Sequence, residues 1–388
     1  MNISSWPEFD NDQINAVIKV LNSGKVNSWT GNQTKLFENQ FSKWSGSKYS
    51  IALANGSLAL SSAYLACGIK KNDEVITTPR TFLATASSIA LLNAIPIFAD
   101  IDIDSGNITA KTIEPLINKK TKAISIVHLG GWPADMESIC DLAKSYNLKV
   151  IEDCAQAHGA SINGKMVGSF GDIGCWSFCQ DKIISTGGEG GMITTSLNDF
   201  WERIWSFKDH GKNLKTINQT NKTALFKYVH DRLGSNFRLT EMQSAIGIIQ
   251  LKKLKSWTKL RQKNAKILIN KLKDCRPLRV PIPENRFQHA WYKLHCYVDP
   301  NFLSENWNRD RIINEIRASG YPAYQGSCSE IYLEKCFLDK GLNPKKRLKN
   351  AKALGDTSIM FLVDQTISNE NMNKYAELIK HIIKKATI

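Results

Sequence analysis

The sequence predicts an α/β protein, with a large domain on a mainly parallel sheet and a smaller C-terminal α+β domain. The chain has 388 residues and is 42% hydrophobic, which suits one or two packed domains with a sizeable core. From about residue 50 to 200, short β-branched runs alternate with helical patterns, as in a parallel sheet covered on both faces. Beyond Pro277 the pattern changes to separated strands and helices.

The expected elements follow from these patterns in order. Strands are expected at residues 49–53, 74–78, 95–99, 122–128, 149–152 and 175–178. Helices are expected between them at 58–66, 84–92 and 136–146, the last ending at Asn147. In the C-terminal part we expect a strand at 290–298, a helix at 307–319 and a closing helix at 371–385.

A long helical pattern from Glu241 to about Lys273 suits a helix that joins two domains. We place the domain boundary within it, so that residues 1–250 form the large domain and 251–388 the small one. The first 15 or so residues can still pack on the small domain. The stretch 212–227, rich in Lys, Asn and Thr, is expected to be a mobile loop whose charge either screens an anionic substrate or is simply solvated.

The formal net charge is +15, which would suit a nucleic acid, an anionic membrane surface or a small acidic substrate. The lysines are spread along the whole chain, and no nucleic-acid motif accompanies them. We therefore expect no nucleic-acid partner, and a general bias toward lysine and asparagine explains most of the excess charge.

The chain gives no sign of secretion or of membrane insertion. Its first residues are polar, and its nine cysteines match neither a disulfide framework nor a CxxC zinc pair. The uncharged stretch 81–99 is broken by Asn93 and Pro96, which predicts a buried helix and strand instead of a membrane span. A reducing, cytoplasmic location fits these features best.

The most informative residue for function is Lys182. It lies five residues after Ser177 and five before the glycine-rich run 187–191 (GGEGG), and Asp153 ends an upstream strand. A lysine in a tight glycine-flanked loop, with a carboxylate at the end of a nearby strand, is how proteins hold pyridoxal phosphate. To attack an aldehyde this lysine must lose its charge, which burial and nearby cations assist.

Two further positions have both a functional and an ordinary interpretation. Gly56-Ser57 opens a helix, where free backbone N–H groups favour a phosphate, although Asn55-Gly56-Ser57 also fits an ordinary turn and N-cap. Asp153 would face the ligand crevice beyond the sheet and keep a pyridine nitrogen protonated, or it caps a helix before Ala155. The residues by themselves leave both alternatives open.

The motifs of other cofactor classes are missing from the sequence. No G-x-G-x-x-G follows a strand, no Walker A pattern is present and no H-E-x-x-H occurs. The seven histidines show no metal-ligand spacing, although His158 lies close to Asp153. We therefore expect no metal site.

Taken together, these residues resemble the DegT/DnrJ/EryC1/StrS family of sugar aminotransferases, a branch of the fold-type I pyridoxal-phosphate enzymes with an aspartate aminotransferase-like fold. The resemblance covers nearly the whole chain. It is carried by the Lys182 loop and by residues 55–60 (NGSLAL), 81–86 (TFLATA), 151–159 (IEDCAQAHG) and 234–238 (GSNFR).

The resemblance implies a role around pyridoxal 5'-phosphate for several matching residues. Gly56 and Ser57 would hold the cofactor phosphate at the helix start, and the hydroxyl of Ser177 would add a hydrogen bond. Phe82 would lie against one face of the pyridine ring.

On the same grounds, Asp153 would pair with the ring nitrogen and Gln156 would contact the ring hydroxyl. Lys182 would be the catalytic residue that forms the Schiff base with the cofactor. Asn236 matches the position that reaches the cofactor phosphate of the neighbouring subunit, so a homodimer with shared active sites is implied. Arg238 is expected to be a structural ion-pair partner.

The implied activity is a two-stage amino transfer. An amino acid, expected to be L-glutamate, converts the cofactor to pyridoxamine 5'-phosphate while Lys182 moves the proton, and a nucleotide-linked keto-sugar then accepts the nitrogen. The product would be an amino sugar for surface polysaccharide, glycan or secondary-metabolite biosynthesis.

Two alternatives to this activity are kept. A sugar dehydratase of the same family would carry histidine at the position of Lys182. A non-catalytic, cofactor-binding or structural relative would lack Asp153, Gln156 or Lys182, and all three are present.

The chain departs from the commoner family pattern at two places. Cys179-Gln180-Asp181 stands where a small or proline-containing sequence is expected, and residues 361–364 (FLVD) stand where many relatives have proline and histidine. These differences concern the sugar-facing side more than the cofactor side. The sequence leaves the nucleotide, the sugar and the aminated carbon open.

Overall fold

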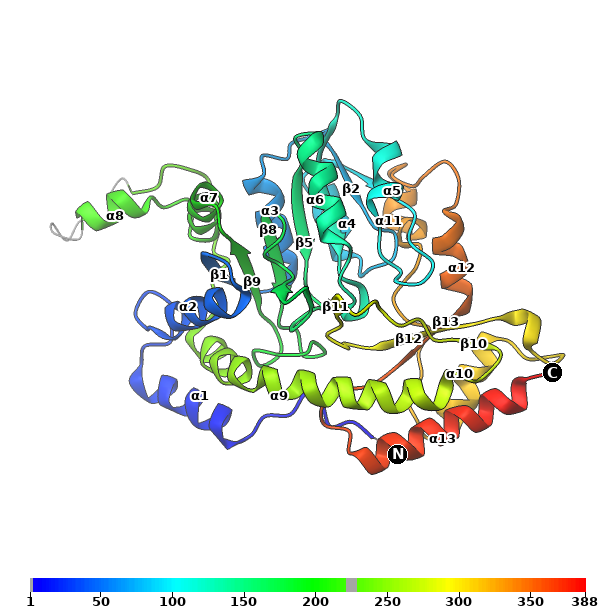
Figure 1. Ribbon diagram of the computed structural model, residues 1–388. Coiled ribbons are helices and arrows are strands. Elements are labelled where there is room, and N and C mark those ends of the chain that lie inside the picture. Colours follow the sequence, from blue (N-terminus) through cyan, green and yellow to red (C-terminus); the bar gives the residue numbers. More distant parts are fainter. Residues whose placement is uncertain (1–2, 221–228) are drawn as a thin grey trace.

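A seven-stranded sheet forms the centre of the computed structural model, which describes residues 3–220 and 229–388 (Figure 1). The strand order is β1-β9-β8-β5-β4-β2-β3. Neighbouring strands pair in parallel, except that β9 is antiparallel to both β8 and β1. The strands are β1 (Tyr49–Leu53), β2 (Glu74–Thr77), β3 (Ile95–Phe98), β4 (Thr121–Val127), β5 (Lys149–Asp153), β8 (Ile173–Ser177) and β9 (Gly191–Thr195). The predicted α/β class is confirmed.

The central strands are buried on both faces, as their nearly continuous apolar sequences require. All five residues of β8 are buried, and so are all five of β9. The covering helices are α3 (Gly56–Ala66), α4 (Ala84–Ala90), α6 (Met136–Ser145) and α7 (Asn198–Lys208). One apolar cluster joins α3 and α7 to the sheet through Leu60, Tyr64 and Phe200, and a second joins α6 to it through Ile139.

Helix α9 (Glu241–Leu272) has 32 residues and runs beneath the sheet in the view of Figure 1. Its N-cap Thr240 accepts a hydrogen bond from the backbone of Gln243, whose side chain bonds back to the cap. The helix was expected at 241–273 and is confirmed. It packs against α1 (Asn11–Ser23), α2 (Gln33–Ser45) and α13 (Asn369–Ala386).

The C-terminal part is an α+β unit. An antiparallel sheet of order β10-β12-β13 is formed by β10 (Leu278–Arg279), β12 (Leu294–Val298) and β13 (Ser358–Phe361). Phe361 of this sheet packs with Ile312 of α10 (Arg309–Ala318) and with Tyr375 of α13. Ile3, near the start of the chain, belongs to the same apolar cluster. Because α9 crosses residue 250 without a break, the boundary between 250 and 251 stays a prediction.

The remaining elements are short or peripheral. A small sheet of order β11-β6-β7 lies outside the two main sheets. The elements are β6 (Ser161–Ile162), β7 (Lys165–Met166), β11 (Phe287–Gln288), α5 (Ala110–Ile113), α8 (Leu214–Thr220), α11 (Lys335–Leu338) and α12 (Lys349–Thr357). Among the described residues, no helix is both long enough and apolar enough to cross a membrane.

Three expectations need correction. The strand expected at 290–298 begins only at Leu294, because the preceding residues bond to the main chain of Gly130 and Gly131 instead. The mobile loop expected at 212–227 contains helix α8, and its residues 221–227 lie outside the described part. Strands β9 and β13 and helices α1, α2 and α7 were not expected.

Candidate active site

A cavity of about 450 Å³ lies beyond the carboxyl ends of β5 and β8, beside the first residues of α3 and α4. Open α/β sheets bind ligands at this edge. Seven of the eight residues predicted for the site line it: Gly56, Ser57, Phe82, Asp153, Gln156, Ser177 and Lys182. Folding therefore brings these distant segments around one space.

Helix α3 presents an open N-terminus to this cavity. Asn55 is its N-cap, and the first main-chain hydrogen bond of the helix ends on the Asn55 carbonyl. The N–H groups of Gly56 and Ser57 precede that bond and have no acceptor within the helix. A methyl group on Gly56 would lie 2.7 Å from Cβ of Ser177, so glycine is what lets the helix start approach β8. This arrangement can hold an anion.

Asp153, the last residue of β5, is a buried carboxylate in the cavity lining. Its Oδ2 accepts a hydrogen bond from Thr85 Oγ1 at 2.8 Å, and its Oδ1 accepts one from the backbone N–H of Ala155 at 3.1 Å. Burial raises the pKa of Asp153, against these hydrogen bonds and the charge of Lys182. A cation placed beside this carboxylate would lower its pKa again, which suits a protonated ring nitrogen.

Gln156 and Phe82 complete this side of the cavity. The backbone N–H of Gly130 donates to Oε1 of Gln156 at 2.6 Å, so the amide N–H groups are what Gln156 can offer to a ligand. The Phe82 side chain is 72% exposed although it is aromatic. A flat ligand lying against its ring would remove apolar surface from water.

The segment between β8 and β9 forms a closed loop. The backbone N–H of Phe178 donates to Gly190 O at 2.8 Å, and that of Gln180 donates to Gly188 O at 3.0 Å. Gly187 and Gly188 have φ angles of 88° and 125°, a region that residues with a side chain rarely adopt. The tight glycine-dependent loop predicted around Lys182 is confirmed.

Lys182 lies in this loop with its ammonium group held by neighbours. Its Nζ is 3.0 Å from Oδ2 of Asp181 and 5.2 Å from the ring centre of Tyr292. The Trp6 indole N–H donates to the Lys182 carbonyl at 2.8 Å. Burial opposes ionisation of Asp181, but the charge of Lys182 and the hydrogen bonds from Tyr292 and Lys182 outweigh it and lower the pKa of Asp181.

Sequence reasoning did not find Trp6, Thr85 or Tyr292 as parts of this environment. Trp6 and Tyr292 lie more than 100 positions from Lys182, and no local pattern connects them. Thr85 stood in one of the family segments, but nothing in the sequence pointed its hydroxyl at Asp153. The unusual Asp181 was the one available signal, because an acidic residue beside a reactive lysine is expected to pair with it.

Asn236 is the predicted site residue that does not line the cavity. It is exposed, its main chain pairs with Asp209, and its Oδ1 accepts a hydrogen bond from the N–H of Arg238 at 3.4 Å. Arg238 Nη1 lies 2.8 Å from Oδ1 of Asp209, which confirms the predicted ion pair.

One group among the described side chains has metal-like spacing: His128, Glu152 and Cys154. His128 Nε2 lies 3.1 Å from Glu152 Oε2. Both Glu152 oxygens also accept backbone N–H groups at 2.7–2.8 Å, and these come from Gly168, Phe170 and Gly171. The carboxylate therefore holds the chain between β7 and β8.

His158 packs between aromatic rings, with its ring centre 5.2 Å from that of Trp176 and 5.7 Å from that of Phe178. Burial, together with the charges of Lys182 and Arg261, lowers the pKa of His158 to about 3. The ring is therefore neutral at physiological pH, and it packs against the rings of Trp176 and Phe178.

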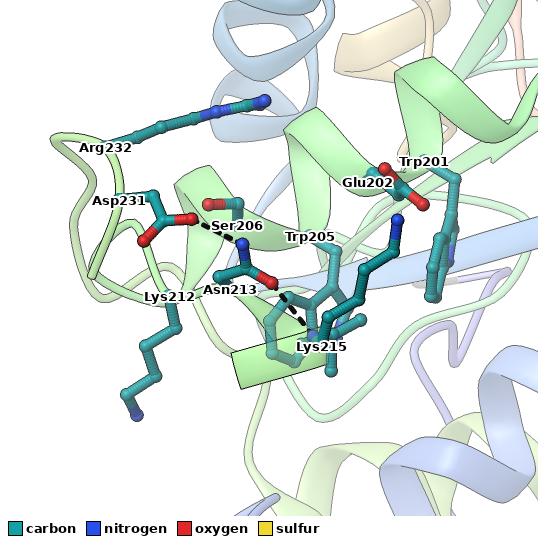
Figure 2. A pocket seen from close by; sticks show the side chains of 10 residues that line it. Trp201, Glu202, Trp205, Ser206, Lys212, Asn213, Lys215, Asp231 and Arg232 are labelled. Atoms are coloured by element: carbon teal, nitrogen blue, oxygen red, sulfur yellow. Dashed lines mark hydrogen bonds between the residues drawn. The ribbon is translucent and has the colours of Figure 1, made fainter. Parts of the chain in front are cut away.

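A second cavity of about 320 Å³ contains none of the predicted site residues (Figure 2). Trp201 and Trp205 of α7 border it, with Lys212 and Lys215 from the next segment. Lys212 is already engaged, since its Nζ lies 3.1 Å from Oδ1 of Asp209. Its carboxylates, Glu202 and Asp231, are exposed, whereas Asp153 in the first cavity is buried.

The first cavity therefore offers three chemical functions around one space: an anion site at α3, a buried carboxylate and a lysine amine. Together these groups can hold a ligand that has a phosphate, a basic ring nitrogen and a reactive carbonyl. Gly56 lets α3 approach β8 closely, because any side chain there would meet Ser177.

Comparison with known proteins identifies relatives of nearly the whole chain. The chain matches the DegT/DnrJ/EryC1/StrS aminotransferase family over residues 7–380. It is similar to the solved aminotransferase from Psychrobacter cryohalolentis, with a TM-score of 0.97, 46% identity and 99% of each chain covered. It is 32% identical to the GDP-perosamine synthase of Vibrio cholerae, over 85% of this chain and 87% of that protein.

A further relative is the spore coat polysaccharide biosynthesis protein SpsC of Bacillus subtilis, which is 33% identical over 98% of this chain and 97% of that protein. The aminotransferases of this family use pyridoxal phosphate, and the likeness to their solved structures confirms the predicted fold. The chain belongs to the DegT/DnrJ/EryC1/StrS aminotransferase family.

Proposed function

We propose that this protein binds pyridoxal 5'-phosphate and transfers the amino group of L-glutamate to the ketone of a nucleotide-linked keto-sugar. The observation that carries the proposal is the meeting of Lys182, Asp153 and the open start of α3 in one cavity of a family member. A non-catalytic relative would be expected to lack Asp153, Gln156 or Lys182, and all three are present. Lys182, in place of histidine, favours amino transfer over dehydration.

The substrate class is supported by the relatives. The Vibrio cholerae protein is named a GDP-perosamine synthase, which makes a nucleotide-linked amino sugar, and SpsC is named for polysaccharide biosynthesis. We infer that the product of this protein is likewise an amino sugar for a surface polysaccharide or glycan. Such work on soluble nucleotide sugars fits a cytoplasmic enzyme.

Each cavity residue has a task in this chemistry. Pyridoxal phosphate, when bound, supplies an aldehyde that takes up nitrogen and a ring that accepts electrons. The N–H groups of Gly56 and Ser57, with the Ser177 hydroxyl, would bind its phosphate. Asp153 would hold the proton on the ring nitrogen, because its negative charge stabilises the cation beside it.

The remaining residues orient the ring and move the proton of the substrate. Gln156 would donate a hydrogen bond to the ring hydroxyl, and Phe82 would cover one ring face and exclude water from it. The Lys182 amine would take the proton from the substrate carbon and return it to the cofactor carbon, as a general base and then an acid.

We further propose that the enzyme is a homodimer in which Asn236 reaches the cofactor phosphate in the partner's cavity. The support is its place on an exposed segment outside the cavity of its own chain. Leu233, on the same segment, is 96% exposed, and a partner would cover this apolar side chain.

The decisive experiment incubates the purified protein with pyridoxal phosphate, L-glutamate and a panel of nucleotide-linked keto-sugars. We expect 2-oxoglutarate and an amino sugar in equal amounts from at least one acceptor. Lys182→Ala should abolish both products, whereas Lys352→Ala, an exposed lysine on α12, should leave the rate unchanged. Failure with every keto-sugar, or full activity of Lys182→Ala, would contradict the proposal.

A further inference from the structure

Asp181 is an acidic residue of the cavity lining to which the proposed function gives no task. It belongs to the segment in which this chain departs from the commoner family pattern. Its Oδ2 lies 3.0 Å from the Nζ of Lys182, and the same oxygen accepts a hydrogen bond from the Tyr292 hydroxyl. The Lys182 amine and the Tyr292 hydroxyl, which lie far apart in the sequence, thus donate to the same carboxylate oxygen.

Tyr292 is itself firmly placed. Its backbone N–H donates to Gly130 O at 3.0 Å, and the Arg261 guanidinium donates to its carbonyl at 3.3 Å. The N–H of that same Gly130 donates to Gln156 at 2.6 Å. A continuous chain of contacts therefore connects Gln156 on one side of the cavity to Lys182 on the other.

The backbone just before Tyr292 supports this placement. Trp291 has a φ angle of 51°, which is unusual for a bulky side chain and costs conformational energy. His289 holds it there: its Nδ1 accepts the Trp291 N–H at 2.7 Å, and the two rings stack at 3.9 Å. The unusual conformation turns the chain immediately before the residue that contacts Asp181.

We propose that Asp181 is a positioning residue for Lys182, with Tyr292 as the group that orients its carboxylate. The carboxylate holds the lysine amine at one wall of the cavity and stabilises its protonated form, because an opposite charge in contact favours an ion. The lysine becomes reactive when it leaves this contact without its proton. The inference deepens the proposed function and rests on it for the chemistry of Lys182.

Other titratable groups also surround Lys182. Those that act on its charge or share its cavity are Asp153, His158, Cys175, Cys179, Glu189, Tyr292 and Lys293. Burial lowers the pKa of His158 to about 3 and, with the charge of Asp181, raises that of Tyr292 well above its usual value, so both are neutral. Burial also raises the pKa of the Cys175 and Cys179 thiols. In the described part of the chain, Asp181 is the group that hydrogen-bonds the amine.

The test measures acetylation of Lys182 by acetic anhydride in the cofactor-free protein across a pH series, with peptide mass spectrometry as the readout. Only an unprotonated amine reacts. Asp181→Asn keeps an acceptor for Tyr292 and removes the charge, so labelling at pH 7.5 should rise roughly three- to tenfold. Asp181→Glu should restore most of the original profile.

Two more variants make the result specific. Glu189→Gln removes the same charge from the same cavity without a contact to the amine, so it should change labelling less. Tyr292→Phe keeps the aromatic ring but removes the hydroxyl that orients the Asp181 carboxylate. It should therefore shift labelling in the same direction as Asp181→Asn. This variant replaces Asp181→Asn in the test if Asp181→Asn does not fold. No shift, or equal shifts for Asp181→Asn and Glu189→Gln, would overturn the inference.

This readout is independent of turnover. A protein that shows the Asp181 shift but acts on no keto-sugar would contradict the proposed function and leave the positioning role standing. An active enzyme that shows no change in Lys182 labelling in Asp181→Asn would contradict the positioning role and leave the proposed function standing.

Discussion

Asp153 is a buried carboxylate in the cavity lining, and its burial opposes its ionisation. Its hydrogen bonds from Thr85 and Ala155 do not offset burial, which raises the pKa of this carboxyl. Between the ordinary value of 3.8 and the raised one, the folded protein binds this proton more tightly than the unfolded chain does. The contribution of Asp153 to the free energy of unfolding therefore falls as the pH rises through that window, and this contribution is constant at higher pH.

We predict that Asp153→Asn raises the thermal unfolding midpoint of the cofactor-free protein at neutral pH, because the variant no longer buries a negative charge. The same variant should bind pyridoxal phosphate more weakly and turn over roughly 100-fold more slowly, since the ring nitrogen loses its partner. Calorimetry with and without the cofactor measures the first two effects.

The pH dependence provides the control for Asp153→Asn. Below about pH 3.8 the carboxyl is neutral in both the folded and the unfolded state, so the variant should lose its advantage there. A variant that is less stable than the wild type at neutral pH, or that binds the cofactor equally well, would contradict this account.

At the scale of elements, the cavity depends on how closely α3 approaches β8. Gly56 makes this possible, because a Cβ there would lie 2.7 Å from Cβ of Ser177. Gly191 does the same on β9, where a Cβ would lie 2.3 Å from the Asn55 carbonyl oxygen. The backbone of the helix start is thus packed directly on two strands.

We predict that Gly56→Ala destabilises the protein by about 1–3 kcal/mol through overpacking and weakens cofactor binding, because α3 must move outward. Chemical denaturation and a pyridoxal phosphate titration measure the two effects. Gly68→Ala is a control with open space around the new methyl group, although its φ of 76° adds backbone strain. Unchanged cofactor affinity in a folded Gly56→Ala protein would exclude this function of the helix start.

A second element-scale feature joins α9 to α2. Asn32, the N-cap of α2, makes no side-chain cap hydrogen bond. The buried Glu241 at the start of α9 replaces it, accepting the N–H groups of Gln33 and Thr34 and the Thr34 hydroxyl. A carboxylate at a helix N-terminus also interacts favourably with the helix dipole.

We predict that Glu241→Gln lowers the free energy of unfolding by about 1–3 kcal/mol, because one charge-assisted acceptor is lost from a buried site. Urea denaturation measures this change in the free energy of unfolding. Glu305→Gln, an exposed glutamate, is the control and should stay within about 0.5 kcal/mol of the wild type. Equal effects of the two substitutions would show that Glu241 does not cap α2.

At the scale of the whole molecule, the proposed dimer places Lys182 and Asn236 of one active site on different chains. A variant that lacks Lys182 and a variant that lacks Asn236 should then complement each other. A mixed dimer of Lys182→Ala and Asn236→Ala chains contains one site with both residues intact and one site with neither.

We predict that co-expression of these two variants restores up to about a quarter of wild-type activity, since half of randomly formed symmetric dimers are mixed and each has one good site. Activity of differently tagged, co-purified dimers measures this. If Asn236 instead serves its own chain, the mixture should not exceed the activity of the separate variants.

The α/β class, most central strands and the long helix α9 could be predicted from the amino-acid pattern, because these elements depend on local apolar periodicity. This pattern also placed Lys182 in a tight loop, because glycines such as Gly187 and Gly188 can adopt the positive φ angles that a tight loop requires. Seven predicted residues meet in the cavity because the carboxyl ends of parallel strands share one edge of a sheet.

The surroundings of these residues could be seen only in the folded protein. The contacts of Lys182 with Trp6 and Tyr292 join positions far apart in the chain, and the raised pKa of Asp153 comes from burial that no sequence window contains. Side-chain contacts and desolvation depend on the complete packing, whereas local patterns fix only the elements that are packed. That is why the sequence predicted the lysine, and the structure found the carboxylate and the tyrosine that hold it.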